Sequence, residues 1–214
     1  MVSRRSLLGA AAGAGALVVV PAAPAFADGK RKWTRKKSAN GWVIDRDAIA
    51  TFRIEGSTAS VALHDGPAAT VLLHVARRWH YEIAPLGTGE GTITGHTSNS
   101  TVRTSYQSNY LSGTAIALYA RAYPLGGSEG LWPHQVQVVR DILVDCAGTV
   151  VWGGDLSPAK AGHFHIVAKP SALRRVAGRL DPRRAPEHRV QLPGMVADPF
   201  SPHRRALARK VARP

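Results

Sequence analysis

The sequence predicts an α+β domain in which short strands alternate with two amphipathic helices. Apolar residues recur at helical spacing in residues 67–83 and 133–146, and each segment begins with a proline, which is favoured in the first turn of a helix. Three short apolar runs, residues 113–119, 150–152 and 163–168, are bordered by glycine or proline, as strands usually are. The chain of 214 residues is long enough for one such domain with its own core.

The region around the first helix has weaker signals. Residues 42–54 and 60–63 are short apolar runs, β-branched in places and separated by Gly56 and Ser57, so they suit a small hairpin. After the helix, residues 85–109 are rich in Gly, Thr and Ser and carry only scattered apolar side chains. We expect this stretch to be a long loop, which is often a functional element and otherwise a disordered one.

Charge divides the chain into a nearly neutral domain and two basic ends. The chain holds 28 Lys and Arg against 14 Asp and Glu, yet residues 38–173 contain nine basic and ten acidic residues. Six cations gather in residues 28–37 and eleven in residues 174–214. We therefore expect a basic flexible arm at residues 28–41, a folded domain at residues 42–173, and a basic, proline-rich and largely disordered tail that starts with one short helix.

The first 27 residues have the order of an export signal. Arg4 and Arg5 precede an apolar run rich in Gly and Ala, and a small-residue motif ends at Ala27. The twin arginine resembles the Tat type of signal, so we expect a folded protein to be exported and to act outside the cytoplasmic membrane or on the wall. Because Cys146 is the single cysteine, no internal disulfide can form, and we expect it to be a small buried residue. No stretch of the mature chain is long and apolar enough for a transmembrane segment.

The most specific motif is residues 108–118, S-N-Y-L-S-G-T-A-I-A-L, which is followed later by residues 160–165, K-A-G-H-F-H. Together they resemble the M15-type metallopeptidases that cut D-alanyl links in peptidoglycan, whose motifs are S-x-H-x-S-G-T-A-x-D and roughly E-x-M-H-F-E. The resemblance covers residues 79–169. It implies an antiparallel core sheet with flanking helices, similar to the D-Ala-D-Ala metallopeptidase fold.

The resemblance also implies that the catalytic site has been dismantled. In that family the His and Asp of the first motif and the His of the second bind zinc, and the Glu is catalytic. The matching positions here are Tyr110, Ala117, His163 and Lys160. Peptide hydrolysis by zinc needs three protein ligands, an open position for water and a carboxylate. We therefore expect an inactive relative with no intact catalytic residue and no cofactor, unless zinc binds at a rebuilt site.

The groove of such a scaffold could bind its ligand without cutting it. We expect a secreted cell-envelope protein that holds an anionic glycopeptide of peptidoglycan or an anionic wall polymer. Five candidate side chains could line the groove: Arg103, Tyr110, Trp152, Asp155 and Lys160. Each of these residues also has a structural alternative. The aromatic residues can pack in the core, the cations can be ordinary surface residues, and Asp155 can cap a turn.

Two other functions stay open. One is a zinc-dependent peptidoglycan peptidase, in which His163 and His165 share one face of a strand and bind the metal with His96, His134 or Asp155. The other is a polyanion-binding module, in which the basic tails bind wall polymers or extracellular DNA by counterion release and the domain is a carrier. Nothing in the sequence encodes sequence-specific recognition of nucleic acid.

Overall fold

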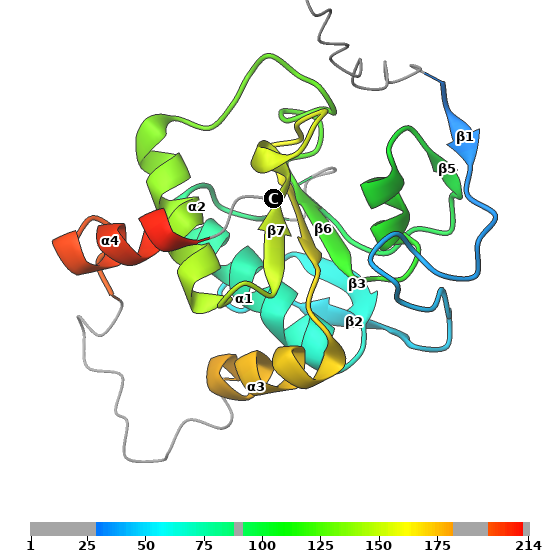
Figure 1. The fold of residues 1–214 in the computed structure, drawn as a ribbon, viewed down its shortest axis with the longest axis horizontal. Helices are drawn as coiled ribbons and strands as arrows, with labels where there is room; N and C mark the ends of the chain where they lie inside the picture. Colours follow the sequence, from blue (N-terminus) through cyan, green and yellow to red (C-terminus); the bar gives the residue numbers. More distant parts are fainter. Residues whose placement is uncertain (1–28, 88–91, 182–196, 212–214) are drawn as a thin grey trace, which may run out of the picture.

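The computed structural model describes residues 29–87, 92–181 and 197–211. Within these ranges the chain forms an α+β fold with small antiparallel sheets and helices packed beside them (Figure 1). The expected export signal lies outside the described residues and stays a prediction. Among the helices of the described ranges, none combines the length and the apolar character that crossing a bilayer requires.

The central sheet is antiparallel and has the strand order β4, β6, β8, β7. β4 spans Ile93–Thr94, β6 spans Ala115–Leu118, β7 spans Val150–Trp152 and β8 spans His163–Ile166. The strands predicted at residues 113–119, 150–152 and 163–168 are confirmed as β6, β7 and β8. β6 and β8 are shorter than predicted. This sheet carries the two sequence motifs.

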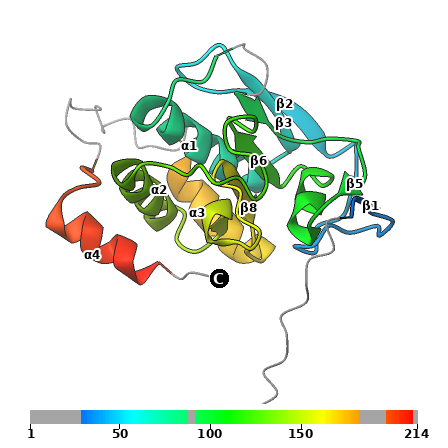
Figure 2. The same ribbon diagram turned by 90° about the horizontal axis from the view of Figure 1, so that it is seen from above.

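Two helices contact one face of the central sheet, and a third packs against the first of them. α1 spans Pro67–Glu82, α2 spans Pro133–Asp145 and α3 spans Pro170–Leu180, and each has a proline at its start. Figure 2 shows them on the side of β6 and β8 away from β1 and β5. Periodicity predicted α1 and α2 closely, and the short helix expected at the start of the tail corresponds to α3. Cys146, which directly follows α2, is buried as expected.

The two faces of the central sheet have different neighbours. On the helical face, Trp79 of α1 packs edge-on against Phe164 of β8, with ring centroids 6.0 Å apart and both side chains fully buried. Because side chains alternate along a strand, Ala117 and His163 belong to the opposite face. That face packs against η1, a 3₁₀-helix at Ser105–Tyr110. The candidate site therefore lies away from the helical core.

A hairpin supports the motif from another side. It consists of β2 (Ile49–Arg53) and β3 (Ser60–His64), which confirms the predicted hairpin with a shorter first strand. The N–H of His64 donates to the carbonyl of Gly113 at 2.9 Å. Gly113 has a φ of 65°, in the left-handed region that favours glycine. The glycine of the S-G-T-A motif is thus required by the turn between η1 and β6.

The structure corrects the expectation of a flexible arm at residues 28–41. β1 (Arg31–Lys32) pairs antiparallel with β5 (Thr101–Val102). The side-chain amide of Asn40 donates to Thr114 Oγ1 and to a carbonyl of β8, at 2.8 Å each. Because both backbone and side chains bond to the sheet region, the described part of this segment belongs to the folded domain.

A second correction concerns the tail at residues 174–214. Its described part contains the end of α3 and a further helix, α4, at Pro202–Lys210. Arg204 of α4 forms ion pairs with Asp141 and Asp145 of α2, and the side chain of Asp141 is fully buried. The helix therefore docks on the domain through buried charges. The rest of the predicted tail lies outside the described residues.

Candidate functional site

The hydroxyl groups of the first motif hold the chain together. Ser112 Oγ lies 2.8 Å from Ser38 Oγ and 2.9 Å from Thr114 Oγ1. Ser108 Oγ accepts a hydrogen bond from a backbone N–H of the N-terminal segment at 2.8 Å. The three motif side chains are fully buried. They position η1 and β6, and their oxygens are already used in this network.

Four positions singled out by the resemblance lie together in space. The hydroxyl of Tyr110 is 2.6 Å from Nδ1 of His163. Ala117 sits directly opposite His163 in the pairing of β6 with β8. Lys160 Nζ lies 3.4 Å from the hydroxyl of Tyr110. The end of η1, the middle of β6 and the start of β8 thus converge on one site.

A chain of hydrogen bonds runs from Lys160 to His165. The Lys160 ammonium has no lone pair, so it donates to the oxygen of Tyr110. Tyr110 then donates to Nδ1 of His163, and Nε2–H of His163 donates to Nδ1 of His165 at 3.0 Å. This direction assigns the Nε2–H tautomer to both imidazoles. Each link uses one donor and one acceptor, so the network is satisfied with both rings neutral.

Burial keeps the links beyond Lys160 uncharged. It lowers the pKa of His163 well below its ordinary value, and the neighbouring His165 and Lys160 add to this effect. Burial also lowers the pKa of His165 to about 4 and raises the pKa of Tyr110. Tyr106 covers the pair, with its ring parallel to His165 and its centroid 4.8 Å from that of His163. At neutral pH the two imidazoles are therefore uncharged.

The hydrogen bonds of His163 limit its ability to bind zinc at the rebuilt site considered from the sequence. Both nitrogens of His163 are engaged, Nδ1 with Tyr110 and Nε2 with His165, whereas a zinc ligand needs a free nitrogen lone pair. In the described ranges, no three His, Cys, Asp or Glu side chains lie close enough together to hold a metal ion. The histidine pair is therefore not joined there by the other ligands considered from the sequence: His96, His134 and Asp155.

A pocket of about 220 Å³ opens beside this network. Tyr110, Ala117 and Lys160 line it. Two apolar residues, Val102 and Ala120, and five hydroxyl or amide side chains complete the lining: Thr94, Thr97, Asn99, Thr101 and Gln107.

Lys160 brings a cation to the pocket wall. No carboxylate of the described residues pairs with it, and its polar partner is the Tyr110 hydroxyl. Its Nζ also lies 5.2 Å from the centroid of the Tyr110 ring. Burial lowers the pKa of Lys160, because the ammonium is partly removed from water. An ammonium without a counterion, among hydroxyl and amide groups, is suited to bind an anion.

Comparison of the chain with protein-family models, curated proteins and solved structures finds no match. The relation to zinc D-alanyl peptidases therefore remains a resemblance. It rests on the two motifs and agrees with the proximity of Tyr110, Ala117 and His163. The chemistry of the site is argued from its own side chains.

The structure places Trp152 and Asp155, two predicted groove residues, outside this pocket. The indole N–H of Trp152 donates to the carbonyl of Ala161 at 2.6 Å. The guanidinium of Arg140 lies over the indole, 4.9 Å from the ring centroid, and pairs with both carboxylate oxygens of Asp155. These residues form a packed stack beside the pocket, and a role for them in ligand binding stays a prediction.

Arg103 also falls outside the lining of the pocket. It is exposed, and its backbone N–H donates to the side chain of Gln107 at 2.7 Å, at the start of η1. The sequence interpretation missed Tyr106 and the polar lining. Their signal was the Thr- and Ser-rich composition of residues 85–109, which shows neither where the loop folds back nor which of its side chains face inward.

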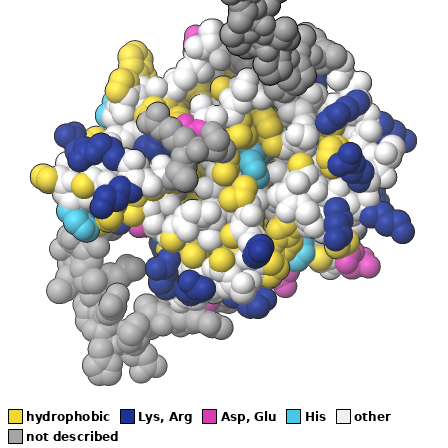
Figure 3. Space-filling model, viewed as in Figure 1, with side chains coloured by type: hydrophobic (Ala, Val, Ile, Leu, Met, Phe, Trp, Pro, Cys, Tyr) yellow, Lys and Arg dark blue, Asp and Glu magenta, His cyan; other side chains and the backbone are white. Residues whose placement is uncertain are grey.

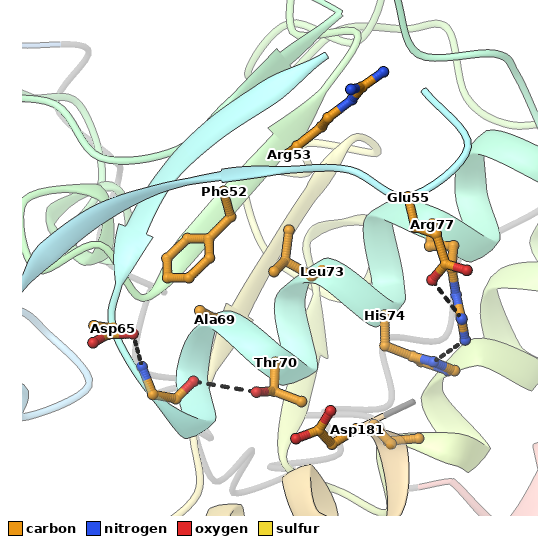
Figure 4. Close-up of a pocket in the computed structure, with 12 residues that line it drawn as sticks. Phe52, Arg53, Glu55, Asp65, Ala69, Thr70, Leu73, His74, Arg77 and Asp181 are labelled. Carbon is orange, nitrogen blue, oxygen red and sulfur yellow. Dashed lines mark hydrogen bonds and ion pairs between the residues drawn. The ribbon is translucent and has the colours of Figure 1, made fainter. Parts of the chain in front are cut away.

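A second pocket, of about 280 Å³, lies between β2, α1 and the end of α3 (Figure 4). Its charged groups are partnered. Arg77 pairs with Glu55 at 3.0 Å and lies 3.4 Å from Nδ1 of His74, while Arg53 donates to the carbonyl of Ser57. This pocket therefore offers a ligand less unsatisfied charge than the pocket beside Lys160.

Proposed function

We propose that this chain is a secreted cell-envelope protein that binds an anionic wall glycopeptide without efficient hydrolysis. The observation that carries the proposal is the Lys160 ammonium, which pairs with no carboxylate of the described residues and lies beside His163, whose two nitrogens are both engaged. The Tat-type export predicted from Arg4 and Arg5 and the degenerate peptidase-like scaffold are parts of the same proposal. It needs no metal and no cofactor.

The side chains explain why cleavage by the zinc mechanism is inefficient. Ala117 has no donor atom, and Tyr110 gives its hydrogen to His163. The position of the family's catalytic carboxylate is Lys160, whose ammonium holds a proton where the mechanism must accept one. The same positive charge repels a metal cation. We expect a peptide bound here to dissociate without being cleaved.

The pocket suits the carboxylate end of a peptide that carries sugars. A charge-assisted bond from Lys160 to a carboxylate is strong in a partly buried site. Thr97, Asn99 and Gln107 supply hydroxyl and amide groups that can bond to peptide amides and sugar hydroxyls. Wall glycopeptides present all these groups together, the carboxylate and amides on the peptide stem and the hydroxyls on the sugar.

The test is a calorimetric titration with a soluble muropeptide that has a free terminal carboxylate. Lys160→Met should weaken binding about 10- to 100-fold, because a hydrogen bond to a charged group contributes about 1.5–3 kcal/mol. Lys169→Met is the matched control, since Lys169 is exposed and lies outside the pocket lining. The same muropeptide with an amidated terminus should bind the parent as weakly as the carboxylate form binds Lys160→Met. Equal affinities across this set would reject the proposal.

One observation favours an alternative, a zinc-dependent peptidoglycan peptidase. His163 and His165 lie on one face of β8 with Nε2 and Nδ1 only 3.0 Å apart, so movement of Tyr110 would free nitrogen atoms for a metal. Metal analysis by mass spectrometry, on protein purified without chelator or affinity metal, tests this function. Stoichiometric zinc that disappears in the His163→Ala, His165→Ala double variant would favour it over simple binding.

A further inference from the structure

Residues 30–37, here named the basic edge, form an ordered surface. β1 pairs with β5 in a fixed register, with Arg31 opposite Val102 and Lys32 opposite Thr101. The backbone N–H of Trp33 donates to a carbonyl beside β5 at 2.7 Å, and its indole N–H donates to the carbonyl of Lys37 at 2.9 Å. These bonds fix the path of the segment, so its cations are held in place before any ligand arrives.

The cations of the basic edge are exposed and have no carboxylate partner within the described part of the chain. Each of the six is solvent-exposed, and none pairs with a carboxylate of the described residues: Lys30, Arg31, Lys32, Arg35, Lys36 and Lys37. Figure 3 shows Lys and Arg side chains gathered on the side of the molecule where Figure 1 places β1. Unpaired cations at this density attract a polyanion by releasing its counterions.

The basic edge borders the pocket of Lys160. Thr101 and Val102 of β5 pair with β1 and also line the pocket. One strand therefore separates the row of exposed cations from the half-buried Lys160 ammonium. A flexible chain that follows the basic edge reaches the pocket by crossing β5.

We propose that the basic edge and the Lys160 pocket form one continuous site for a polyol-phosphate chain, a linear polymer of phosphodiesters without bases. Successive phosphates pair with Arg31, Lys32, Arg35 and Lys36, and an anionic group of the same chain enters the pocket. A preformed row of cations loses little conformational freedom on binding, which favours affinity. This inference rests on the proposed function only in that the Lys160 pocket binds an anion.

The environment of Trp33 favours this polymer over a nucleic acid. The guanidinium groups of Arg31 and Arg35 lie over its ring, 6.0 and 5.5 Å from the centroid. A base that stacked on this indole would have to displace them, whereas a phosphate can bond to the same guanidinium groups where they are.

The path of the site favours a polyol phosphate over a polymer of acidic sugars. The bound chain must turn from the basic edge across β5 to reach the pocket. A polyol phosphate has several rotatable single bonds in each unit and can make this turn, whereas a polymer of uronic acids is a chain of rigid sugar rings.

The probe is a synthetic oligomer of eight glycerol phosphates, titrated at several salt concentrations. The edge variant is Arg31→Gln with Lys32→Gln. Its matched control is Arg174→Gln with Arg175→Gln, which removes the same charge from exposed positions on α3, on the other side of the sheet. Lys160→Met tests whether the pocket contributes to the same site. A muropeptide with a free carboxylate is titrated into all four proteins.

The edge variant should bind the oligomer about tenfold more weakly at low salt, and the slope of log K against log salt should fall by about 1.4, since each lost phosphate contact removes about 0.7. The control should keep the parental slope, and Lys160→Met should also bind the oligomer more weakly. An equal loss in the control, no loss in Lys160→Met, or equal binding of a single-stranded DNA or oligouronate of the same charge would overturn the inference. Muropeptide binding separates the two proposals, because it should depend on Lys160 and not on the edge.

Discussion

The hydroxyl of Tyr110 lies 2.6 Å from Nδ1 of His163. By the resemblance drawn from the sequence, these residues match two of the three zinc-ligand positions of the D-alanyl metallopeptidases. A phenol therefore bonds to the imidazole that the resemblance implies as a metal ligand. Ala117, at the third position, leaves room for the aromatic ring because its side chain is a single methyl group.

Removing this hydroxyl should destabilise the fold. Tyr110→Phe leaves Nδ1 of a fully buried His163 without its donor, which costs about 1–3 kcal/mol. Urea denaturation of the purified protein measures this change. Tyr81→Phe is the control. Because Tyr81 is 65% exposed, this variant should unfold at the same urea concentration as the parent. Equal midpoints for Tyr110→Phe and the parent would show that the bond does not contribute.

Stability should fall as the pH drops from about 7 to about 4. His165 has a pKa of about 4 in the folded protein because it is buried, against about 6.5 when unfolded. Between these values the unfolded state binds more protons, so acidification favours unfolding, by up to about 3 kcal/mol for this group. Denaturation series at different pH values should give a flatter profile for His165→Gln. An unchanged slope would contradict the assigned burial effect.

A second acid transition should appear below this window. Burial would raise the pKa of Asp145, but hydrogen bonds from His74 and Arg204 outweigh it and lower the pKa below its ordinary value. The stabilisation is therefore present above the unfolded pKa of about 4 and is lost as the pH falls further. His165→Gln should leave this lower transition in place.

Introducing the two zinc-ligand types that the resemblance implies should create a metal site. Tyr110 contacts His163 and Ala117 faces it across the strand pair, so Tyr110→His with Ala117→Asp brings three ligands to one place. Equilibrium dialysis against zinc should give one tightly bound ion per chain. The single variants, each with fewer ligands, are the controls. Failure of the double variant to bind zinc more tightly than either single variant would show that these positions do not form a metal site.

The docking of α4 should depend on Arg204. Arg204→Ala removes the ion pairs to Asp141 and Asp145, although Arg78 still pairs with both carboxylates. We expect a loss of about 1–3 kcal/mol, less than for a buried charge left with no partner. Thermal unfolding measures it, and hydrogen exchange should show faster opening of α4. The exposed Arg209→Ala, on the same helix, should change neither.

Local patterns predicted the parts of the fold that carry their own signal. Helical spacing placed α1 and α2, and the alternation in β8 correctly put Phe164 on one face and His163 on the other. These signals arise between residues that are close together in the sequence, so they can be detected from one sequence alone. Tyr110, Ala117 and His163 lie close together, which agrees with the resemblance. This proximity does not establish membership of the peptidase family.

Long-range contacts explain what the sequence did not predict. The basic edge has the composition of a solvated arm, and its order comes from pairing with β5, about seventy residues later. α4 has a proline at its start and Ser201 as its cap, yet its partner Asp141 lies 63 residues earlier than Arg204. The roles of Trp152 and Asp155 likewise depend on Arg140 from another element.

Native mass spectrometry of the purified protein with a carboxylate-ended muropeptide, in buffer that contains zinc, tests the central claim most directly. It reports the bound ligand, its integrity and any metal in one spectrum. The proposal predicts a one-to-one complex with the intact muropeptide and no zinc, and loss of that complex in Lys160→Met. A zinc adduct of the parent together with a muropeptide cleaved by addition of water would contradict it.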